Sequence, residues 1–252
     1  MPKIFGRNPV FEALRAGQRS VEKVFLARGA SGDTIEKISS LARARKIICE
    51  NVSKERLDEL AGYGTHQGVL AIVKGLTFKE LPVIISELKD STINPFFLIV
   101  DSVEDPRNLG ALIRTASAAG VHAVIIPKRR SAGITEVVVK SSAGAVEWIN
   151  CVRVSNLVNC CHLLKKQGIW IIGAESDADD LWYTVDYTLP LAIVVGGEGK
   201  GLSRLLRAEC DFLVSMPMKS AINSLNISVA AGILMYEVLR QRNLHITGAH
   251  ES

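Results

Sequence analysis

The apolar runs of this 252-residue sequence are short. Residues 96–100 and 191–195 hold five apolar residues each, whereas a membrane-spanning helix needs ~20. The N-terminal stretch MPKIFGRNPV also lacks the apolar core of a secretory signal peptide. We therefore expect a cytoplasmic protein without a membrane partner.

Cysteine is scarce as well. The number is odd, no two cysteines form a C-x-x-C pair, and the spacing is irregular: Cys49, Cys151, Cys160, Cys161 and Cys210. Neither a disulfide framework nor a zinc site fits this pattern. We expect reduced, mostly buried thiols and no bound metal.

Both common glycine-rich phosphate-binding patterns are missing. Residues 196–201, GGEGKG, contain four glycines, but no G-x-G-x-x-G register fits them. No glycine stands five residues before the Gly-Lys pair, and neither Ser nor Thr follows Lys200, so the segment is not a P-loop. A nucleotide-hydrolysing enzyme therefore lacks its phosphate loop in this sequence.

Positive charge is concentrated at the front of the chain, although the net charge is only +4. Residues 1–75 hold 13 Lys and Arg against 8 Asp and Glu, while the remainder holds 17 against 18. This excess suits a module that meets phosphates, and a solvated basic surface is the alternative.

Hydrophobic periodicity and helix breakers divide the chain into two α/β parts. Residues 1–75 alternate short strands and helices, and residues 76–94, with a helix near 83–88, read as a linker. From residue 95 onward the alternation is regular. It predicts strands at 96–100, 123–126, 149–154, 169–174, 191–195 and 212–216, with helices between them and a last helix over 226–242.

Such alternation predicts a mostly parallel sheet covered on both faces. Ligands of these sheets bind at the carboxyl ends of the strands, where three unusual loops stand. The first runs from Asp101 to Arg114, with Asn108 as a candidate helix cap; a capped helix with a surface arginine and a functional site both fit it. In the second, glycines frame Glu198. In the third, Ser224 and Asn226 are cap-type residues before the last helix.

The sequences of these loops resemble three motifs of the SpoU (TrmH) family of RNA ribose 2′-O-methyltransferases, within the SPOUT superfamily. The matching segments are NLGALIRTASAAGVHAVI, VVGGEGKGLSRL and SMPMKSAINSLNISVAAGIL. IFGRNPVFEAL and HQGVLA resemble the small substrate-binding domain of the RlmB branch. The likeness thus covers nearly the whole chain.

The resemblance implies a ribosomal-protein-like RNA-binding domain over 1–75, a linker over 76–94 and a SPOUT domain over 95–252 with a C-terminal trefoil knot. It also implies a homodimer in which the last helix contributes to the interface. The apolar positions of that helix fit core packing and a dimer interface equally well. S-adenosylmethionine is the implied methyl donor.

Site residues carried over from the resemblance fall into three groups. The catalytic group is Asn108, Arg114, Glu198, Ser224 and Asn226. The donor-binding group is Gly173, Ala174, Gly196, Met216 and Leu225. Candidates for RNA contact are Arg7, Asn8, His66, Gln67, Lys128, Arg129 and Arg130. A solvated turn remains the alternative for 128–130, and a structural role the alternative for His66.

The resemblance points to methylation of a guanosine ribose in 23S ribosomal RNA. A transfer-RNA ribose methyltransferase and an antibiotic-resistance ribosomal methyltransferase are alternatives with the same chemistry. A noncatalytic RNA-binding ribosome assembly factor is an alternative of another class. Because a guanidinium stays protonated in proteins, we expect Arg114 to clamp phosphate rather than act as a general base.

Overall fold

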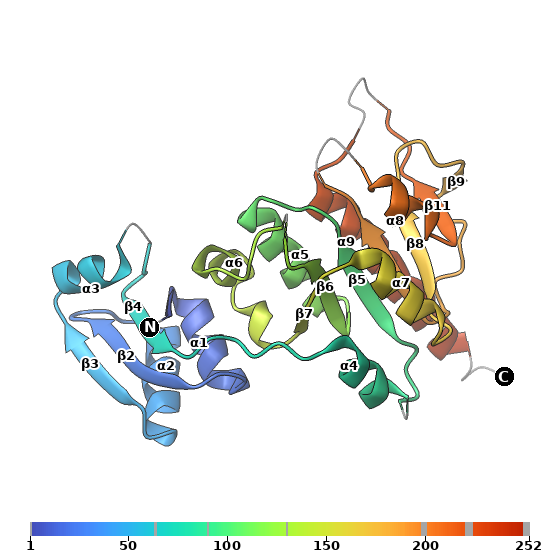
Figure 1. Ribbon diagram of the computed structural model, residues 1–252. Coiled ribbons are helices and arrows are strands. Elements are labelled where there is room, and N and C mark those ends of the chain that lie inside the picture. The colour runs from blue at the N-terminus through green and yellow to red at the C-terminus, as the bar shows by residue number, and fades with distance from the viewer. Residues whose placement is uncertain are drawn as a thin grey trace. The chain divides into compact units, whose positions relative to one another are not determined.

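The computed structural model describes residues 2–62, 65–89, 91–129, 131–197, 201–219 and 224–248, with the side chains of 244–248 excepted. It divides into two compact units (Figure 1). The small unit contains Met1–Thr77 and Ile134–Trp148, and the large unit contains Phe78–Gly133 and Ile149–Ser252. Within the described residues, no helix is long and apolar enough to cross a membrane.

A four-stranded sheet forms the centre of the small unit. Its order is β1 (Lys3–Phe5), β4 (Val69–Val73), β2 (Val21–Ala27) and β3 (Ile48–Val52). Strand β4 runs antiparallel to β1 and β2, whereas β2 and β3 are parallel. The helices are α1 (Arg7–Ala16), α2 (Asp33–Ala44) and α3 (Lys54–Ala61).

Local sequence explains the ends of these helices. The Ser53 side chain accepts a hydrogen bond from the backbone N–H of Arg56 and so caps α3. Gly17 ends α1 in the left-handed conformation, which glycine adopts without steric cost. The alternation of short strands and helices expected over 1–75 is present.

Residues 134–148 fold with the small unit, although they connect two strands of the large unit. They form α6 (Glu136–Ser141), which Thr135 caps, and the 3₁₀ turn η1 (Ala145–Glu147). Val138, Val139 and Val146 are buried there. The helix expected over 135–142 therefore exists, but its apolar side chains pack with α1 and β1.

The large unit is built on a seven-stranded sheet in which every pair of neighbours is parallel. The expected parallel α/β architecture is confirmed. In spatial order the strands are β7 (Asn150–Val154), β6 (Ala123–Pro127), β5 (Phe96–Val100), β10 (Leu191–Val195), β8 (Trp170–Ala174), β11 (Phe212–Ser215) and β9 (Asp180–Leu181). The two central strands, β5 and β10, are buried at every position.

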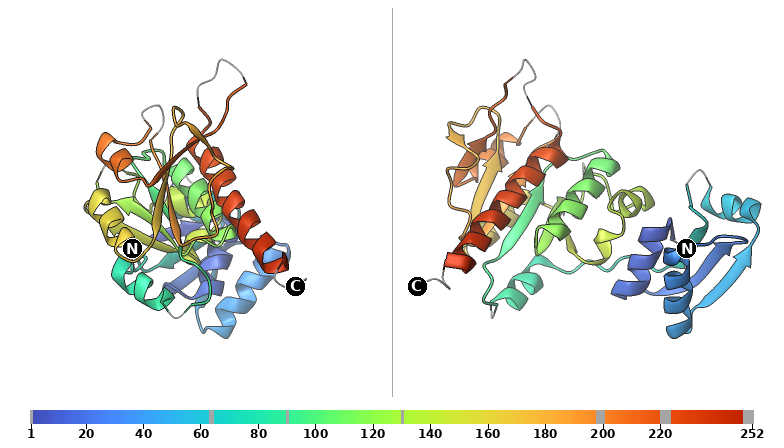
Figure 2. Two further views of the ribbon diagram at one scale, coloured as in Figure 1. Left: turned by 90° about the vertical axis from the view of Figure 1, so that its right-hand side faces the viewer. Right: turned by 180° about the vertical axis from the view of Figure 1, so that it is seen from behind.

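Helices cover both faces of this sheet (Figure 2). On one face, α4 (Leu81–Leu88), α7 (Leu157–Lys165) and α8 (Arg204–Ala208) join the apolar core cluster. On the other, α5 (Pro106–Ala118) packs against α9 (Ile227–Gly248), which also contacts β10. The trefoil knot stays a prediction.

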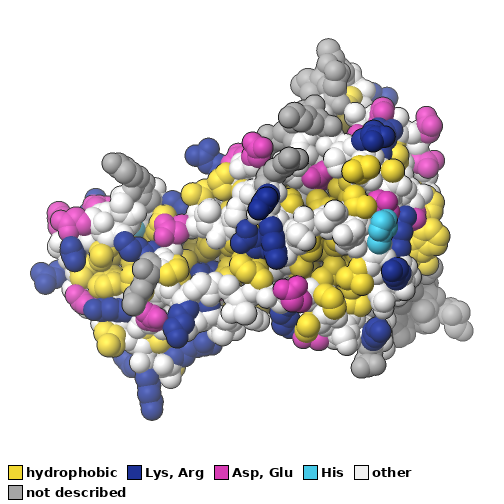
Figure 3. Space-filling view, viewed as in Figure 1, with side chains coloured by type: hydrophobic (Ala, Val, Ile, Leu, Met, Phe, Trp, Pro, Cys, Tyr) yellow, Lys and Arg dark blue, Asp and Glu magenta, His cyan; other side chains and the backbone are white. Residues whose placement is uncertain are grey.

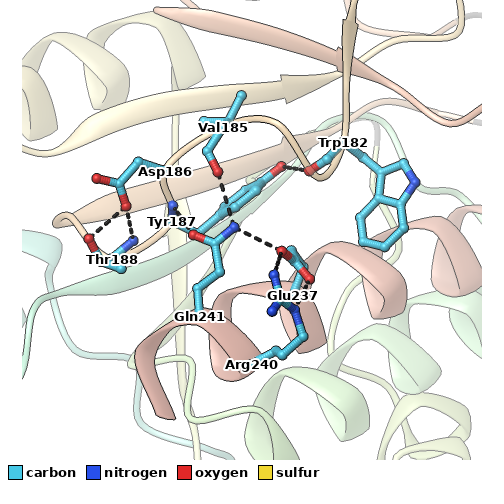
Figure 4. A network of polar contacts seen from close by, with 8 residues as sticks. All are labelled: Trp182, Val185, Asp186, Tyr187, Thr188, Glu237, Arg240 and Gln241. Carbon is cyan, nitrogen blue, oxygen red and sulfur yellow. Dashed lines mark hydrogen bonds and ion pairs between the residues drawn. The ribbon is translucent and has the colours of Figure 1, made fainter. Parts of the chain in front are cut away.

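A polar network holds the segment after β9 against α9 (Figure 4). The buried Tyr187 donates its hydroxyl hydrogen to Trp182 O at 2.6 Å, and its backbone N–H donates to Gln241 Oε1 at 2.8 Å. Gln241 Nε2 donates in turn to Val185 O and to Glu237 Oε1. One helix turn thus fixes residues 182–187 and, with them, the position of α9.

Three of the five cysteines, Cys151, Cys160 and Cys161, are buried, and all five are free thiols. Burial raises the pKa of Cys160 and Cys161 to about 12, so both remain protonated at neutral pH. The expectation of reduced thiols holds in the structure.

Candidate functional site

A cavity of about 940 Å³ opens at the carboxyl edge of the large sheet. Parallel strands end together there, so their loops meet although they lie far apart in the sequence. The walls come from the ends of β8, β10 and β11 and from the start of α9. They include Ala174, Glu175, Val195, Gly196, Met216, Leu225, Asn226 and Ile227.

Four of the five residues expected to bind the donor line this cavity: Ala174, Gly196, Met216 and Leu225. The fifth, Gly173, is buried one position earlier in β8. A Cβ atom on Gly173 would lie 2.6 Å from Cys210 Sγ and 2.8 Å from Leu202 Cδ1. Gly173 is therefore needed for close packing behind the cavity wall.

The glycine loop folds back on itself directly after β10. A Cβ atom on Gly196 would collide with the backbone of Gly201, and Gly197 and Gly201 form an isolated β-bridge. Gly201 also has a φ of 61°, which favours glycine. These constraints, rather than flexibility, explain the glycines. Glu198, the catalytic candidate in this segment of the sequence, lies outside the described residues.

Two carboxylates hold the returning limb of the loop. Glu175 Oε1 accepts the backbone N–H of Leu202 at 2.5 Å, and Asp101 Oδ2 accepts that of Ser203 at 3.3 Å. The sequence reasoning did not single out either residue. The sequence could have indicated both, because each is an acidic residue directly after an apolar strand.

Asn108 and Asn226 meet although 118 positions separate them. Asn226 Nδ2 donates to Asn108 Oδ1 at 3.1 Å, while Asn226 Oδ1 accepts from the backbone N–H and hydroxyl of Ser228. Asn226 thus caps α9 and still reaches the first motif. The first and third loops are joined by this contact.

The cap of α5 is Asp105, not Asn108. Its side chain accepts the backbone N–H of Arg107 at 2.8 Å, because Pro106 takes the first helical position. Asn108 lies within α5, and its amide oxygen accepts from Asn226. Ser224 is exposed at the cavity rim and lies two residues before the cap of α9.

Arg114 lies on α5, about 9 Å further along the helix axis than Asn108. Its side chain is exposed, and no hydrogen bond or ion pair joins it to another residue in the part of the chain that the structure describes. The structure places Arg114 on the same helix as Asn108 without bringing the two into contact.

The RNA-contact candidates of the small unit gather at one edge of its sheet. The backbone N–H of Arg7 donates to Gln67 Oε1 at 3.1 Å, and Arg7 Nε donates to Gln67 O at 3.2 Å. Asn8 is exposed beside them. His66 is buried, accepts the N–H of Gly68 at Nδ1 and lies 2.8 Å from Asp58 through Nε2. This environment favours the structural alternative for His66.

In the large unit, Lys128 and Arg129 are exposed directly after β6. Arg130 lies outside the described residues. Arg153 donates to the Lys128 carbonyl at 3.3 Å, which fixes the backbone but leaves the Lys128 side chain in solvent.

The small unit contains a second cavity, of about 1000 Å³, that sequence reasoning missed. It runs beside α2 and β3, and its polar side chains include two arginines and one carboxylate: Arg28, Ser31, Glu36, Ser39, Ser40, Arg43 and Asn51. In Figure 3, basic side chains lie among acidic and apolar ones on the visible surface of this unit.

A parallel sheet with a cavity at the carboxyl ends of its strands is typical of an α/β enzyme, and comparison with known proteins identifies the family. Residues 95–236 match the SpoU rRNA Methylase family, and residues 3–79 match the family described as RNA 2′-O ribose methyltransferase substrate binding. The chain belongs to the SpoU family of RNA methyltransferases.

Relatives of similar length support this membership. YacO of Bacillus subtilis (strain 168), named as a TrmH family tRNA/rRNA methyltransferase, is 41% identical over 95% of this chain and 96% of its own length. A protein of Staphylococcus saprophyticus with the same family name is 41% identical over the same shares.

Solved structures agree with the sequence relatives. The SpoU methyltransferase AviRb from Streptomyces viridochromogenes, in complex with AdoMet, is 25% identical and covers 95% of this chain and 90% of its own, with a TM-score of 0.79. The motif-based expectation of a SpoU-family RNA methyltransferase is confirmed. Among the described residues, no group of three or more His, Cys, Asp or Glu is arranged to hold a metal ion.

Proposed function

We propose that this protein transfers a methyl group from S-adenosylmethionine to the 2′-hydroxyl of a guanosine ribose in 23S ribosomal RNA. The observation that carries the proposal is the contact between Asn108 and Asn226 at the rim of the 940 Å³ cavity. It joins two family motifs beside a pocket in a chain that also carries the substrate-binding domain.

The cavity fits such a donor. Its volume lies in the range of small-molecule sites, ~300–1,000 Å³. Met216, Leu225 and Ile227 offer apolar walls, and the backbone of the glycine loop offers groups that recognise a base without a charged side chain. When bound, the donor supplies a methyl group that its sulfonium already activates.

The chain's own residues must orient and activate the ribose. A hydroxyl is a poor nucleophile until its proton is removed or shared, and correct placement lowers the barrier further. The Asn108–Asn226 pair is positioned to orient the ribose at the rim of the cavity. Arg114 clamps the adjacent phosphate, and Ser224 with Glu198 completes the polar rim, with Glu198 as a water-mediated proton acceptor.

RNA contacts extend over both units in this proposal. Arg7, Asn8 and Gln67 bind RNA from the small unit, with His66 supporting their loop, and Lys128, Arg129 and Arg130 bind phosphate from the large unit. The domains are a substrate-binding domain over 1–75, a linker over 76–94 and a knotted methyltransferase domain over 95–252. The match of residues 3–79 and the exposed cations after β6 support this division.

A homodimer in the cytoplasm completes the proposal. Val229 and Tyr236 are each 50% exposed on α9, seven residues and thus about two turns apart on one face. Large apolar side chains exposed along one helix face are typical of an interface. A second copy of the chain would cover this stripe.

The test is to map 2′-O-methylation in ribosomal and transfer RNA from cells with and without this protein. We expect one 23S guanosine to lose its methyl group when the protein is absent and to regain it when the gene is restored. Loss confined to a transfer RNA would replace the rRNA assignment with the tRNA alternative. Unchanged methylation together with defective ribosome assembly would favour the noncatalytic factor.

A further inference from the structure

Glu175 lies between the donor cavity and the glycine loop. It follows β8 directly and lines the cavity. Its Oε1 accepts the backbone N–H of Leu202 at 2.5 Å. A Cβ atom on Gly201 would lie 2.7 Å from its Oε2, so both carboxylate oxygens touch the returning limb of the loop. The side chain is only partly exposed.

The charge of Glu175 is not balanced within the described wall of the cavity. The ionisable residues in that part of the wall are Glu175, Asp177 and Arg207. Arg207 donates to both carboxylate oxygens of Asp177, at 2.8 and 3.0 Å, and this hydrogen bonding holds the pKa of Asp177 below its usual value. Arg207 is also attracted to Glu175, and the three groups together carry one net negative charge.

We propose that Glu175 is a positioning and specificity-determining residue that favours the charged methyl donor over the product of the reaction. The inference rests on the proposed function, because it takes the donor to be a sulfonium. During transfer the sulfur–methyl bond breaks and an oxygen–methyl bond forms. The sulfur keeps the bonding electron pair and becomes neutral, while the ribose hydroxyl releases its proton to water.

The carboxylate therefore attracts the sulfur centre before transfer and no longer does so afterwards. Coulomb attraction is strong enough at a partly buried site to change affinity severalfold, whereas solvent would screen most of it on an open surface. This attraction raises the affinity for the donor. The affinity for the product is therefore lower than that for the donor. The same side chain also holds Leu202, and with it the returning limb of the glycine loop, beside the cavity.

The two roles separate in a pair of variants. Glu175→Gln retains an oxygen that can accept the N–H of Leu202 but removes the charge. Glu175→Ala removes both. Asp179→Asn is the matched control. Like Glu175, Asp179 lies in the segment between β8 and β9, but it is exposed and lies outside the cavity wall. The measurement is the dissociation constant of full-length protein for S-adenosylmethionine and for S-adenosylhomocysteine, by calorimetry without RNA.

We expect Glu175→Gln to weaken donor binding about fivefold to tenfold and to change product binding less than about twofold. Glu175→Ala weakens both ligands, since the loop loses its anchor, and Asp179→Asn leaves their ratio unchanged. Melting curves without ligand show whether each variant is folded.

An unchanged ratio of the two constants in a folded Glu175→Gln variant would overturn the specificity role. Equal constants for Glu175→Ala and Glu175→Gln would overturn the positioning role. Failure of the proposed function has another signature, because the wild-type protein would then bind neither ligand. That result would overturn the inference together with the function on which it rests.

Discussion

Asparagine side chains carry the clearest single contact of the candidate site. Asn108 accepts from Asn226, while Asp105 caps α5. An amide can donate and accept at once, so Asn226 caps α9 with its oxygen and binds Asn108 with its nitrogen. A carboxylate at position 226 would lose the second of these bonds.

Arg114 is the residue whose proposed role is most directly testable. Its guanidinium is exposed and remains charged, so its removal should take away a phosphate clamp without disturbing the core. We expect Arg114→Ala to lower the rate of methyl transfer by about 10²-fold to 10³-fold. The melting temperature and donor affinity should stay unchanged, and near-wild-type turnover would remove Arg114 from the site.

At the scale of elements, the crossover between β6 and β7 is unusual. Parallel strands need a crossover, and its helix normally covers their own sheet. Here α6 and η1 belong to the small unit instead. The chain therefore passes between the units three times, at residues 77–78, 133–134 and 148–149.

A buried ion pair anchors this crossover. Arg19 reaches Glu147 through two contacts, at 3.0 and 2.5 Å, and both side chains are almost inaccessible to solvent. Trp148 Nε1 also donates to Glu12 Oε2 at 2.7 Å, and Arg15 lies over the Trp148 ring. A fragment of residues 1–77 would lose all of these contacts.

Removal of one partner of the pair should destabilise the small unit strongly. We expect Glu147→Ala to lower the free energy of unfolding by about 3–5 kcal/mol, because Arg19 is left as a buried, unpaired charge. The double variant Arg19→Met, Glu147→Leu should recover most of that loss. Glu59→Gln, which breaks an exposed pair with Arg56, should change it by less than about 1 kcal/mol. Urea unfolding followed by circular dichroism measures the free energy of unfolding of all three variants.

The pH dependence of stability should identify the same residue. Burial raises the pKa of Glu147 above its ordinary value of 4.5, despite the opposing effect of Arg19. At a pH between 4.5 and the raised pKa of Glu147, this side chain is protonated in the folded chain and ionised in the unfolded chain. The free energy of unfolding should therefore fall as pH rises through this window, and Glu147→Gln should remove that slope. An identical slope in the variant would assign it to other groups.

At the scale of the whole molecule, the two units differ in charge. The small unit holds 14 Lys and Arg against 10 Asp and Glu, a net charge of +4, whereas the large unit holds 16 against 16. The second cavity lies in the positive unit and has Arg28 and Arg43 in its wall. The proposal places RNA contacts in both units, and Arg28 and Arg43 are further candidates for phosphate contact in the small one.

Salt dependence of RNA binding tests these two candidates. We expect the double variant Arg28→Gln, Arg43→Gln to reduce the slope of log affinity against log salt by about 1.4, or 0.7 for each lost phosphate contact with single-stranded RNA. Lys89→Gln with Lys166→Gln, which removes two exposed charges from the large unit, should leave the slope unchanged. Equal slopes for both variants would place the phosphate contacts elsewhere.

Much of the fold was predictable because local signals encode it. Each of the six strands expected after residue 95 is present, since buried parallel strands are continuous apolar runs. Strand β9 was missed because two residues carry no periodicity, and Asn108 was misread as a cap because Asp105 stands three positions earlier. The sequence indicated that the three loops form a site, but it did not indicate which residues of different loops contact one another.

The sequence alone determined the family, the alternation of strands and helices and the residues that end them, because neighbouring side chains decide these features. Tertiary structure decided that Asn108 meets Asn226, that Glu175 holds the glycine loop and that residues 134–148 fold with the small unit. These contacts depend on strand order and packing between distant segments. Periodicity places a helix on the chain, but only packing decides which core receives its apolar face.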